Sequence, residues 1–476
     1  MAGSVLSTPG YSLTPAPSKV TLPSNYINNF DFLNQYLPDT YEKEFERYGN
    51  RSVASFLRAV GAEMPSNSDL IKWTEQGRLH TQYTGVTADD ALSAVVTGQQ
   101  KFSIASGTCV FRIGQTIILS SAADSATLKA IVVGVAGSVY NSVALAADEF
   151  VVAYYGTTGI TSGRTDVVTF VYGSEFRKGT NGMVGSLEAE SNFFENKPII
   201  IKDKYEVSGS DMAQIGWVEV TTENGATGYL WYIKSEHETR LRFEDYMEMA
   251  MIEGVPAASG SGALNYLSPA PGATDAGTEG MFYVIENRGN VWSGGNPSTL
   301  ADFDAIIERL DKQGAIQENV LFLNRQFGFD IDDMLAAQNS YGAGGTSYGL
   351  FDNDEKMALN LGFSGFKRGY EFYKTDWKYL NDATLRGGLA ADKVNGVLVP
   401  AGSMTVYDQV MGKNATRPFL HVRYRASETE NRRYKTWMTG SAGGASNSDL
   451  DAMEVHFLSE RALCTMGANN FFIFKD

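Results

Sequence analysis

Apolar residues recur at helical spacing in a stretch that ends near residue 254. Phe243 and Met247 fall on one face of this stretch, as expected for a helix with one buried side. Ser235 is followed three residues later by Glu238, the pattern of a capping box, and Gly254 is typical of a helix end. The pattern predicts a long, surface-lying helix between these limits.

A second helical pattern runs from Thr299 to about Gln313 and ends at Gly314. A short apolar run, 320–323, is typical of a buried strand, and the apolar residues within 329–335 predict another helix. Residues 40–60 predict two short amphipathic helices. The helix–strand–helix order favours an α+β or α/β region.

The pattern between residues 86 and 174 is different. Short runs rich in valine, isoleucine, threonine and tyrosine occur at 110–119, 131–135 and 150–156. Glycine, serine and aspartate separate these runs, as in strands joined by tight turns. The stretch predicts a small antiparallel β-domain.

Two segments predict extended arms. Residues 1–38 contain five of the 13 prolines, which fix φ and remove backbone donors. Residues 186–220 have β-prone stretches at both ends of a polar middle and predict a two-stranded arm. Both arms are expected to lie on another copy of the chain. The side chains predicted to make these contacts are Phe193, Phe194, Tyr205, Trp217, Tyr26 and Phe30.

Composition narrows the functional classes. The formal net charge is -16 and the pI about 4.8, which disfavours a freely diffusing nucleic-acid-binding role. The two cysteines, Cys109 and Cys464, are far apart and have no metal-ligand neighbours, so neither a disulfide framework nor a zinc site is predicted. No signal peptide or membrane-spanning segment is expected, because the apolar runs are short.

Several segments together resemble the major capsid proteins of tailed bacteriophages with the Hong-Kong-97-type fold. The resemblance covers roughly residues 110–340. The segments that carry it are 111–117, 171–179, 197–205, 217–220, 243–254 and 280–285. The proline-rich arm and the overall length are also similar to capsid proteins of the crAss-like phage group.

The resemblance implies an α+β capsid fold with an inserted small antiparallel β-domain. The implied parts are 1–38, extended N-terminal arm; 39–85, N-terminal helices; 86–174, inserted β-rich domain; 175–225, extended loop; 226–320, spine helix and peripheral domain; and 321–476, axial domain and returning peripheral strands.

The resemblance also implies a function and partners. Copies would assemble as pentamers and hexamers into an icosahedral shell that encloses double-stranded DNA in the virion, after assembly in the host bacterial cytoplasm. The implied partners are other copies of the chain, a scaffolding protein, a portal, decoration or auxiliary capsid proteins, head fibres and, weakly, the packaged DNA. No membrane partner and no cofactor are implied. An encapsulin-like compartment or another virion structural protein is the alternative.

Candidate chemistry is sparse. Ser347 lies in a Gly-x-Ser-x-Gly sequence, the pattern of an α/β hydrolase, but a glycine-rich loop precedes it where that site needs a strand. The four histidines have no helical pairing, and the acidic clusters 330–333 and 352–355 lack the glycine and glutamate of a calcium loop. We therefore predict no catalytic, cofactor or metal site.

One local basic patch stands out on this acidic chain. Residues at alternate positions of a predicted strand would share one face, and further cations follow closely. DNA contact inside a shell and salt bridges to an acidic neighbour both remain open at this point. The patch consists of His421, Arg423, Arg425, Arg432 and Arg433.

Overall fold

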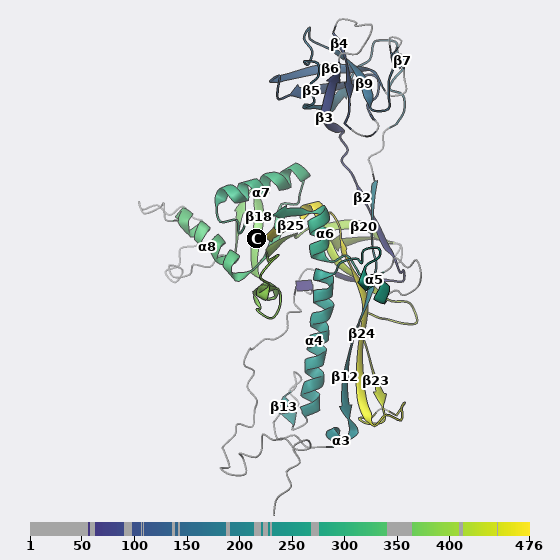
Figure 1. The fold of residues 1–476 in the computed structure, drawn as a ribbon, viewed down its shortest axis with the longest axis vertical. Coiled ribbons are helices and arrows are strands. Elements are labelled where there is room, and N and C mark those ends of the chain that lie inside the picture. The colour runs from purple at the N-terminus through teal and green to yellow at the C-terminus, as the bar shows by residue number, and fades with distance from the viewer. Residues whose placement is uncertain are drawn as a thin grey trace, which may run out of the picture. The chain divides into compact units, whose positions relative to one another are not determined.

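The structure is a computed structural model, mixed α+β with mostly strands (Figure 1). It describes residues 56–57, 62–89, 98–105, 107, 109–135, 139–140, 143–186, 191–213, 220–221, 227–228, 231–267, 276–339, 364–408, 413–444 and 446–476. The chain divides into two compact units. In the described part, the smaller unit comprises Ile201–Met247 and Tyr434–Ser459, and the larger comprises Ser55–Ile200, Glu248–Arg433 and Glu460–Asp476.

The larger unit contains a six-stranded mixed sheet. Its central strands are apolar, and two helices pack on it through a core that includes Phe303, Leu321 and Phe474. The strands, in sheet order, are β15 (Asn290–Trp292), β25 (Phe472–Lys475), β19 (Val394–Pro400), β16 (Glu318–Leu323), β18 (Tyr370–Asp376) and β17 (Gly365–Arg368). The two helices are α7 (Leu300–Gln313) and α8 (Arg325–Asn339).

The ends of α7 confirm the sequence prediction. Thr299 accepts a hydrogen bond from the backbone of Asp302, whose carboxylate accepts in return from the Thr299 backbone N–H. Gly314 ends the helix in the left-handed region, with φ of 70°. The predicted strand at 320–323 is confirmed as part of β16, and the helix that follows it is α8.

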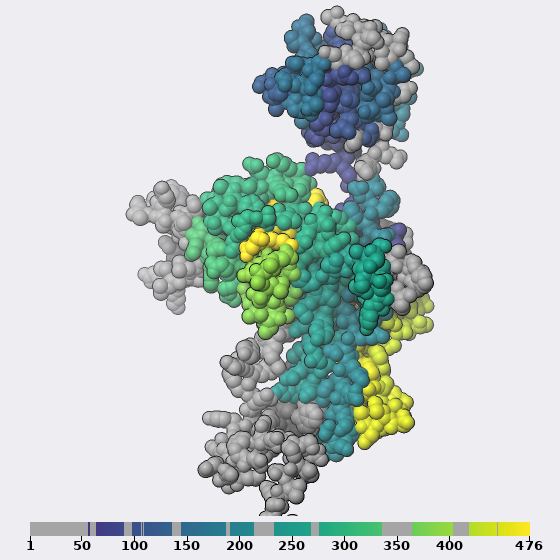
Figure 2. Space-filling model, in the orientation of Figure 1, coloured from purple at the N-terminus to yellow at the C-terminus, as the bar shows by residue number. Residues whose placement is uncertain are grey.

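A closed antiparallel barrel occupies the stretch that predicted β structure. Its interior is filled by apolar side chains such as Phe102, Ile117 and Phe150, all fully buried. The space-filling view shows the barrel as a rounded body, in dark blue (Figure 2). Its strands are β3 (Gln82–Asp89), β4 (Gln99–Ser103), β5 (Gln115–Ser121), β6 (Ala126–Gly134), β9 (Glu149–Tyr154) and β10 (Val167–Ser174), closing in the order β10-β3-β4-β9-β6-β5.

The barrel also holds a charged cluster. The buried Lys101 Nζ lies 2.7 Å from Glu149 Oε1 and 3.0 Å from Asp89 Oδ2. The hydrogen bond from Lys101 lowers the pKa of the Glu149 carboxyl below its ordinary value. The stabilisation from this carboxylate is therefore present above the unfolded pKa, about 4.3, and lost as pH falls through the lower folded pKa.

We expect the thermal stability of the unassembled chain to fall as pH decreases from about 5 to about 3. Lys101→Met is expected to melt at a lower temperature at neutral pH, because it leaves two acids without their buried cation. It should also lose less stability on acidification than the wild type. Lys178→Met, which removes an exposed lysine, is the control. Equal acid sensitivity of the Lys101 variant and the wild type would contradict this role.

Two strands of the larger unit form an antiparallel ribbon, β2 (Ile71–Gln76) with β11 (Ser191–Asn196). Beside it, β1 (Ala62–Ser66) pairs in parallel with β22 (Leu420–Arg425), and β22 pairs with residues 461–465 of β24 (Ala452–Thr465). The strands β1 and β2 lie in the range 39–85, for which helices were predicted. That prediction is wrong from residue 62 onward, because its helical pattern ends at Gly61.

The smaller unit packs a helix on a sheet. The helix is α4 (Trp231–Glu253), and it covers strands β12 (Ile199–Ser208), β23 (Lys435–Gly440) and β24 through a core centred on Phe243 and Phe457. The predicted helix is confirmed, but the predicted cap is wrong. Ser235 lies inside α4, where its carbonyl accepts a hydrogen bond from the Thr239 hydroxyl, because the helix begins one turn earlier, at Trp231.

Within residues 186–220 the described strands do not pair with each other, and the predicted second strand lies mostly outside the described residues. The strand at 199–201 is present as part of β12, but its sheet neighbour is β24, while β11 pairs with β2. Trp217 lies outside the described residues, as do Tyr26, Phe30 and Ser347. The other described elements are α3 (Gly209–Met212), α5 (Gly262–Leu267), α6 (Met281–Arg288), α9 (Lys378–Asn381), β7 (Val139–Tyr140), β8 (Val143–Ala144), β13 (Val220–Thr221), β14 (Thr227–Gly228), β20 (Ser403–Asp408), β21 (Lys413–Pro418) and the 3-10 helices η4 (Arg386–Gly388) and η5 (Ala468–Asn470).

Candidate assembly surfaces

The β2–β11 ribbon presents two adjacent phenylalanines in opposite directions. Phe194 is half-buried opposite Trp73, with 6.2 Å between ring centroids, and the Arg288 guanidinium lies 4.5 Å from its ring centroid. Phe193 points to the other face and exposes 75% of its surface. Alternation along a strand therefore places one ring inward and the other in solvent.

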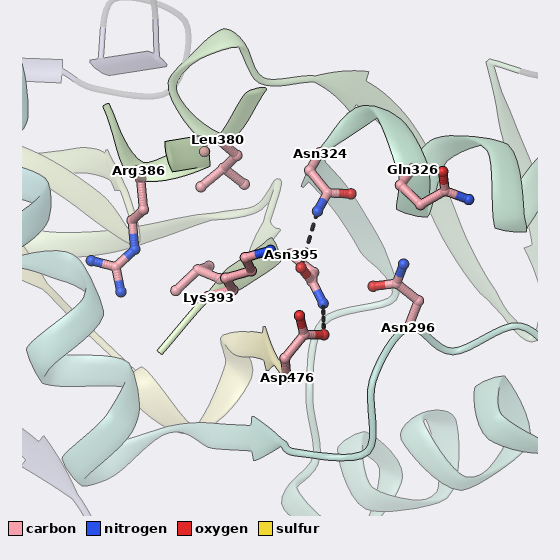
Figure 3. A pocket seen from close by; sticks show the side chains of 10 residues that line it. Asn296, Asn324, Gln326, Leu380, Arg386, Lys393, Asn395 and Asp476 are labelled. Atoms are coloured by element: carbon pink, nitrogen blue, oxygen red, sulfur yellow. Dashed lines mark hydrogen bonds between the residues drawn. The ribbon is translucent and has the colours of Figure 1, made fainter. Parts of the chain in front are cut away.

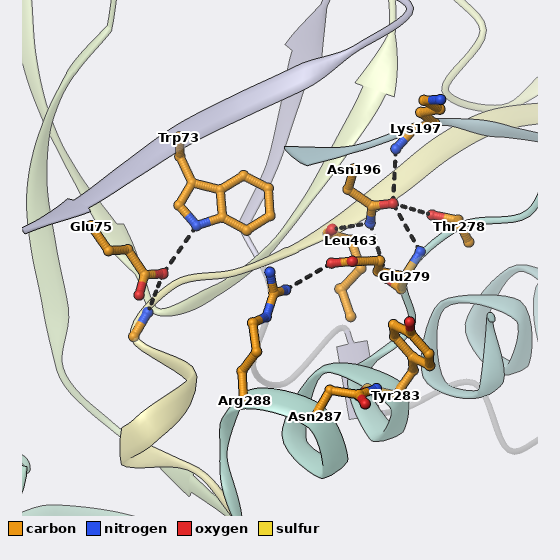
Figure 4. Close-up of polar contacts among 11 residues, drawn as sticks. Trp73, Glu75, Asn196, Lys197, Thr278, Glu279, Tyr283, Asn287, Arg288 and Leu463 are labelled. Carbon is orange, nitrogen blue, oxygen red and sulfur yellow. Dashed lines mark hydrogen bonds and ion pairs between the residues drawn. The ribbon is translucent and has the colours of Figure 1, made fainter. Parts of the chain in front are cut away.

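A buried side chain fixes the end of this ribbon. The Asn196 amide nitrogen donates to the backbone oxygens of Glu279 (2.9 Å) and Leu463 (2.7 Å). Its oxygen accepts from the backbone N–H groups of Lys197 (2.8 Å) and Glu279 (2.8 Å), and from the Thr278 hydroxyl (3.0 Å). Figure 4 shows these bonds converging on one side chain. A single amide thus joins β11 to β24 and to the segment before α6.

Further polar contacts hold the inner face of the ribbon (Figure 4). Arg288, at the end of α6, lies 2.7 Å from a Glu279 carboxylate oxygen while its guanidinium covers Phe194. Glu75 accepts from the Trp73 indole N–H at 3.0 Å and from the Gly467 backbone at 2.9 Å. The inner face is therefore bound to the chain, whereas the outer face, with Phe193, is open.

Tyr205, predicted as a contact to another copy of the chain, is half-buried within its own chain. On β12 the odd-numbered residues face α4, and Tyr205 packs beside the buried Val207 in the core of the smaller unit. The even-numbered Lys204 faces the other way, where its ammonium lies 2.7 Å from Glu206 and 2.8 Å from Glu454. The hydrogen bond from Lys204 lowers the pKa of the Glu454 carboxyl. Tyr205 therefore contributes to the hydrophobic core of the smaller unit.

The predicted basic patch is present on β22 and the loop that follows it, but acidic residues of the same chain neutralise it. Arg425 pairs with Asp69, and the Arg432 guanidinium lies 2.6 Å from Glu460. His421 is buried, with Nδ1 3.3 Å from the Pro418 oxygen. Arg425, Arg432 and Arg433 therefore pair with carboxylates of the same chain, which lowers the positive charge that the patch offers to DNA.

Glu63 binds two further cations of this network. It pairs with Arg433 and with the buried Arg461, whose Nη1 lies 3.3 Å away. Burial lowers the pKa of the Arg461 guanidinium. Arg423 is half-buried, and its Nε has no hydrogen-bond partner among the described residues. This network ties β1, β22 and β24 together from residues far apart in the sequence.

A polar pocket of about 210 Å³ lies between α8, β19 and the last residue of the chain (Figure 3). Asn395 donates to Asp476 at 2.6 Å and accepts from Asn324 at 3.0 Å. Asn324 also accepts from the Phe327 backbone in the first turn of α8, and Arg386 donates to Glu253 at 2.6 Å. These polar groups form hydrogen bonds within the chain, so we interpret their role in the pocket as stabilising the fold.

The described residues contain no group of three or more histidine, cysteine, aspartate or glutamate side chains placed to hold a metal ion. Of the acidic cluster at 330–333, Asp330 accepts from Asn296 and Asp332 pairs with Lys374. Cys109 and Cys464 are buried and do not form a disulfide with each other. Among the helices of the described part, none combines the length and apolar character needed to cross a bilayer.

Neither a protein-family model nor a curated protein matches this chain. Among solved structures, a chain from Microbacterium phage Oxtober96 is 10% identical, with a TM-score of 0.39 and coverage of 92% of this chain and 96% of that one. A chain described as "Capsid of native GTA particle computed with C5 symmetry" is 10% identical, with a TM-score of 0.37 and coverage of 93% and 96%. One described as "Asymmetric unit of bacteriophage PhiM1 mature capsid" is 9% identical, with a TM-score of 0.32 and coverage of 63% and 78%. Because these sequence identities and TM-scores are low, we infer the function from the residues of this chain.

Proposed function

We propose that this chain is a shell-forming structural subunit, the major capsid protein of a tailed bacteriophage with the Hong-Kong-97-type fold. The observation that carries the proposal is the β2–β11 ribbon. Its inner face is fixed by Asn196, Arg288 and Glu75, and its outer face presents Phe193 to solvent. A rigid strand that holds an aromatic ring outward is suited to bind another protein surface.

In such an assembly, contacts between copies contribute a large part of the stability of the particle. An exposed ring such as Phe193 contributes little to the isolated chain but can anchor an interface once a neighbour covers it. Interfaces between permanent subunits commonly bury about 2,000 Å² or more. Because the ribbon and the surface that receives it differ, the contact would be heterologous and would close identical copies into rings.

The finer assignments follow from the sequence resemblance. Copies would form pentamers and hexamers that tile an icosahedral shell around double-stranded DNA. A scaffolding protein, a portal and decoration proteins would be the partners, and the virion capsid the location. The neutralised arginine network favours weak contact with DNA, because a wall that gripped the polymer tightly would hinder packaging. Membership of the crAss-like group belongs to the same proposal.

Electron microscopy of the expressed chain, with the neighbouring genes of its source, tests the proposal. We expect closed icosahedral particles. A chain that stays monomeric at high concentration in the presence of those partners would overturn the capsid assignment. Open tubes or fibres would indicate another virion part, and small shells loaded with a cellular protein would indicate an encapsulin-like compartment.

A further inference from the structure

The outer wall of the barrel carries a patch of exposed aromatic side chains. Tyr155, Phe170, Tyr172 and Phe176 each expose between 39% and 52% of their surface, and Ile113 exposes 50%. Exposed apolar residues scattered singly need no explanation, whereas a contiguous group on a small soluble domain marks a binding surface. We call the four aromatic residues, together with Ile113, the aromatic patch.

Direct contacts connect the two tyrosines of the aromatic patch through neighbouring polar residues. The Tyr155 hydroxyl donates to Glu175, and the Lys129 ammonium lies 5.8 Å from the Tyr172 ring centroid. The Tyr155 backbone N–H donates to the Lys129 oxygen at 3.1 Å, which joins the two tyrosines through one lysine. Phe170 lies two residues before Tyr172 on the same outer face of β10. Lys129 and Glu175 offset each other in charge.

Phe176 is held at the edge of the patch by a glycine. A Cβ atom at Gly114 would lie 2.5 Å from the Phe176 ring, so only glycine allows the ring to lie on that backbone. The φ of Gly114, 91°, requires glycine for a second reason. The backbone N–H of Glu175 donates to the Gly114 oxygen at 2.9 Å. The rings are therefore positioned before any partner binds, which lowers the entropic cost of binding.

A partner cannot bind the barrel by adding a strand to its sheet. Its six strands close on themselves, so it has no open edge to accept an added strand. Rigid aromatic side chains with polar tips suit extended proline-rich peptides, which dock between such rings at little entropic cost. The patch thus favours a ligand that is extended, nearly uncharged and rich in proline.

The chain itself contains a segment with this chemistry. Residues 1–38 include five prolines, among them Pro15 and Pro17 in Thr-Pro-Ala-Pro-Ser, and only two charged side chains, Lys19 and Asp31, which cancel. The segment lies outside the described residues and precedes Phe56, which is buried in the larger unit with its backbone N–H donating to Glu248 at 2.9 Å. At about 3.1 Å per residue, a segment of this length could reach roughly 120 Å, enough for an adjacent subunit.

We propose that the aromatic patch of one copy binds the proline-rich segment 1–38 of a neighbouring copy. This inference rests on the proposed shell function and names both partners of one inter-subunit contact. In this contact the barrel of each copy binds segment 1–38 of the next copy. Because two different surfaces meet, the contact is heterologous and can close identical copies into a ring.

Photo-cross-linking of assembled particles tests the proposal. Tyr172→p-benzoylphenylalanine chains of normal isotopic composition are assembled with wild-type chains labelled with ¹⁵N, and the particles are irradiated. We expect cross-linked peptides that join position 172 of one chain to residues 1–38 of a labelled chain. Ala147→p-benzoylphenylalanine is the control, because Ala147 is exposed and separated from Tyr155 by the whole length of β9. Cross-links from position 172 to another segment, to another protein or to nothing would overturn the proposal.

A second measurement does not depend on particles. A fluorescent peptide of residues 1–38 is titrated onto the full-length unassembled chain and followed by anisotropy. The double variant Tyr155→Ala with Tyr172→Ala is expected to bind at least about tenfold more weakly than the wild type, as for the loss of central aromatic contacts. Equal binding by both would refute the role of the patch. If no particles form but the peptide binds as expected, the shell proposal fails and the segment–patch interaction stands.

Discussion

Replacing Asn196 with aspartate is expected to destabilise the larger unit by about 3 kcal/mol or more at neutral pH, because two buried donors become an anionic acceptor. The native amide nitrogen donates to the carbonyl oxygens of Glu279 and Leu463. In the variant, a carboxylate oxygen would face these two oxygens without a proton between them. The three hydrogen bonds that the amide oxygen accepts cannot offset that repulsion.

The pH dependence distinguishes this mechanism from simple loss of packing. The buried carboxylate of Asn196→Asp would have a raised pKa, so the variant should regain stability as pH falls and the acid becomes a donor. Urea denaturation at several pH values measures the free energy of unfolding of the unassembled variant and of the wild type. Asn181→Asp makes the same chemical change at an exposed position and is expected to change stability by less than about 0.5 kcal/mol. A neutral effect of Asn196→Asp would show that the amide does not organise the ribbon end.

Local signals in the sequence predicted several elements correctly. The limits of α7 follow from Thr299 and Gly314, because a cap depends only on residues within one turn. The strands between 86 and 174 follow from alternation and turn residues, which are equally local. The Ser235 prediction failed for a related reason: a capping pattern does not exclude a further helical turn before it.

Pairing between distant segments could not be predicted in this way. The sheet neighbour of β12 is β24, about 250 residues later, and no local pattern in either strand specifies the other. The carboxylates that neutralise the basic patch, such as Glu63 and Glu460, are likewise remote from most of the arginines that they meet. Charge counting therefore suggested a surface that could bind DNA or a neighbour, whereas the fold pairs it within the chain.

The most informative residue of the candidate surface gave no sequence signal. Asn196 stands between a glutamate and a lysine in a polar context that normally predicts solvent exposure. Its burial and its five hydrogen bonds arise only because β11, β24 and the segment before α6 meet there. Phe193 and Phe194 were predicted together as contacts to a neighbour, but only the register with β2 shows which of them faces outward.

The outward position of Phe193, set by the register between β2 and β11, leads to a second prediction with a large effect. Phe193→Ala is expected to leave the melting temperature of the unassembled chain nearly unchanged, because the ring makes few contacts within its own chain. In assembly, loss of a central aromatic anchor costs about 2 kcal/mol per contact, so half-assembly should require roughly 30-fold more protein. Light scattering against concentration measures assembly, and differential scanning calorimetry measures the isolated chain.

Two variants on the same strand make this result specific. Asn192→Ala removes an exposed polar side chain one position away and is expected to assemble like the wild type. Phe194→Ala should lower the melting temperature as well as assembly, because it removes the ring held between Trp73 and Arg288. If Phe193→Ala instead melts early while assembling at the wild-type concentration, its ring belongs to the fold of the chain, and the open face of the ribbon has no part in joining copies.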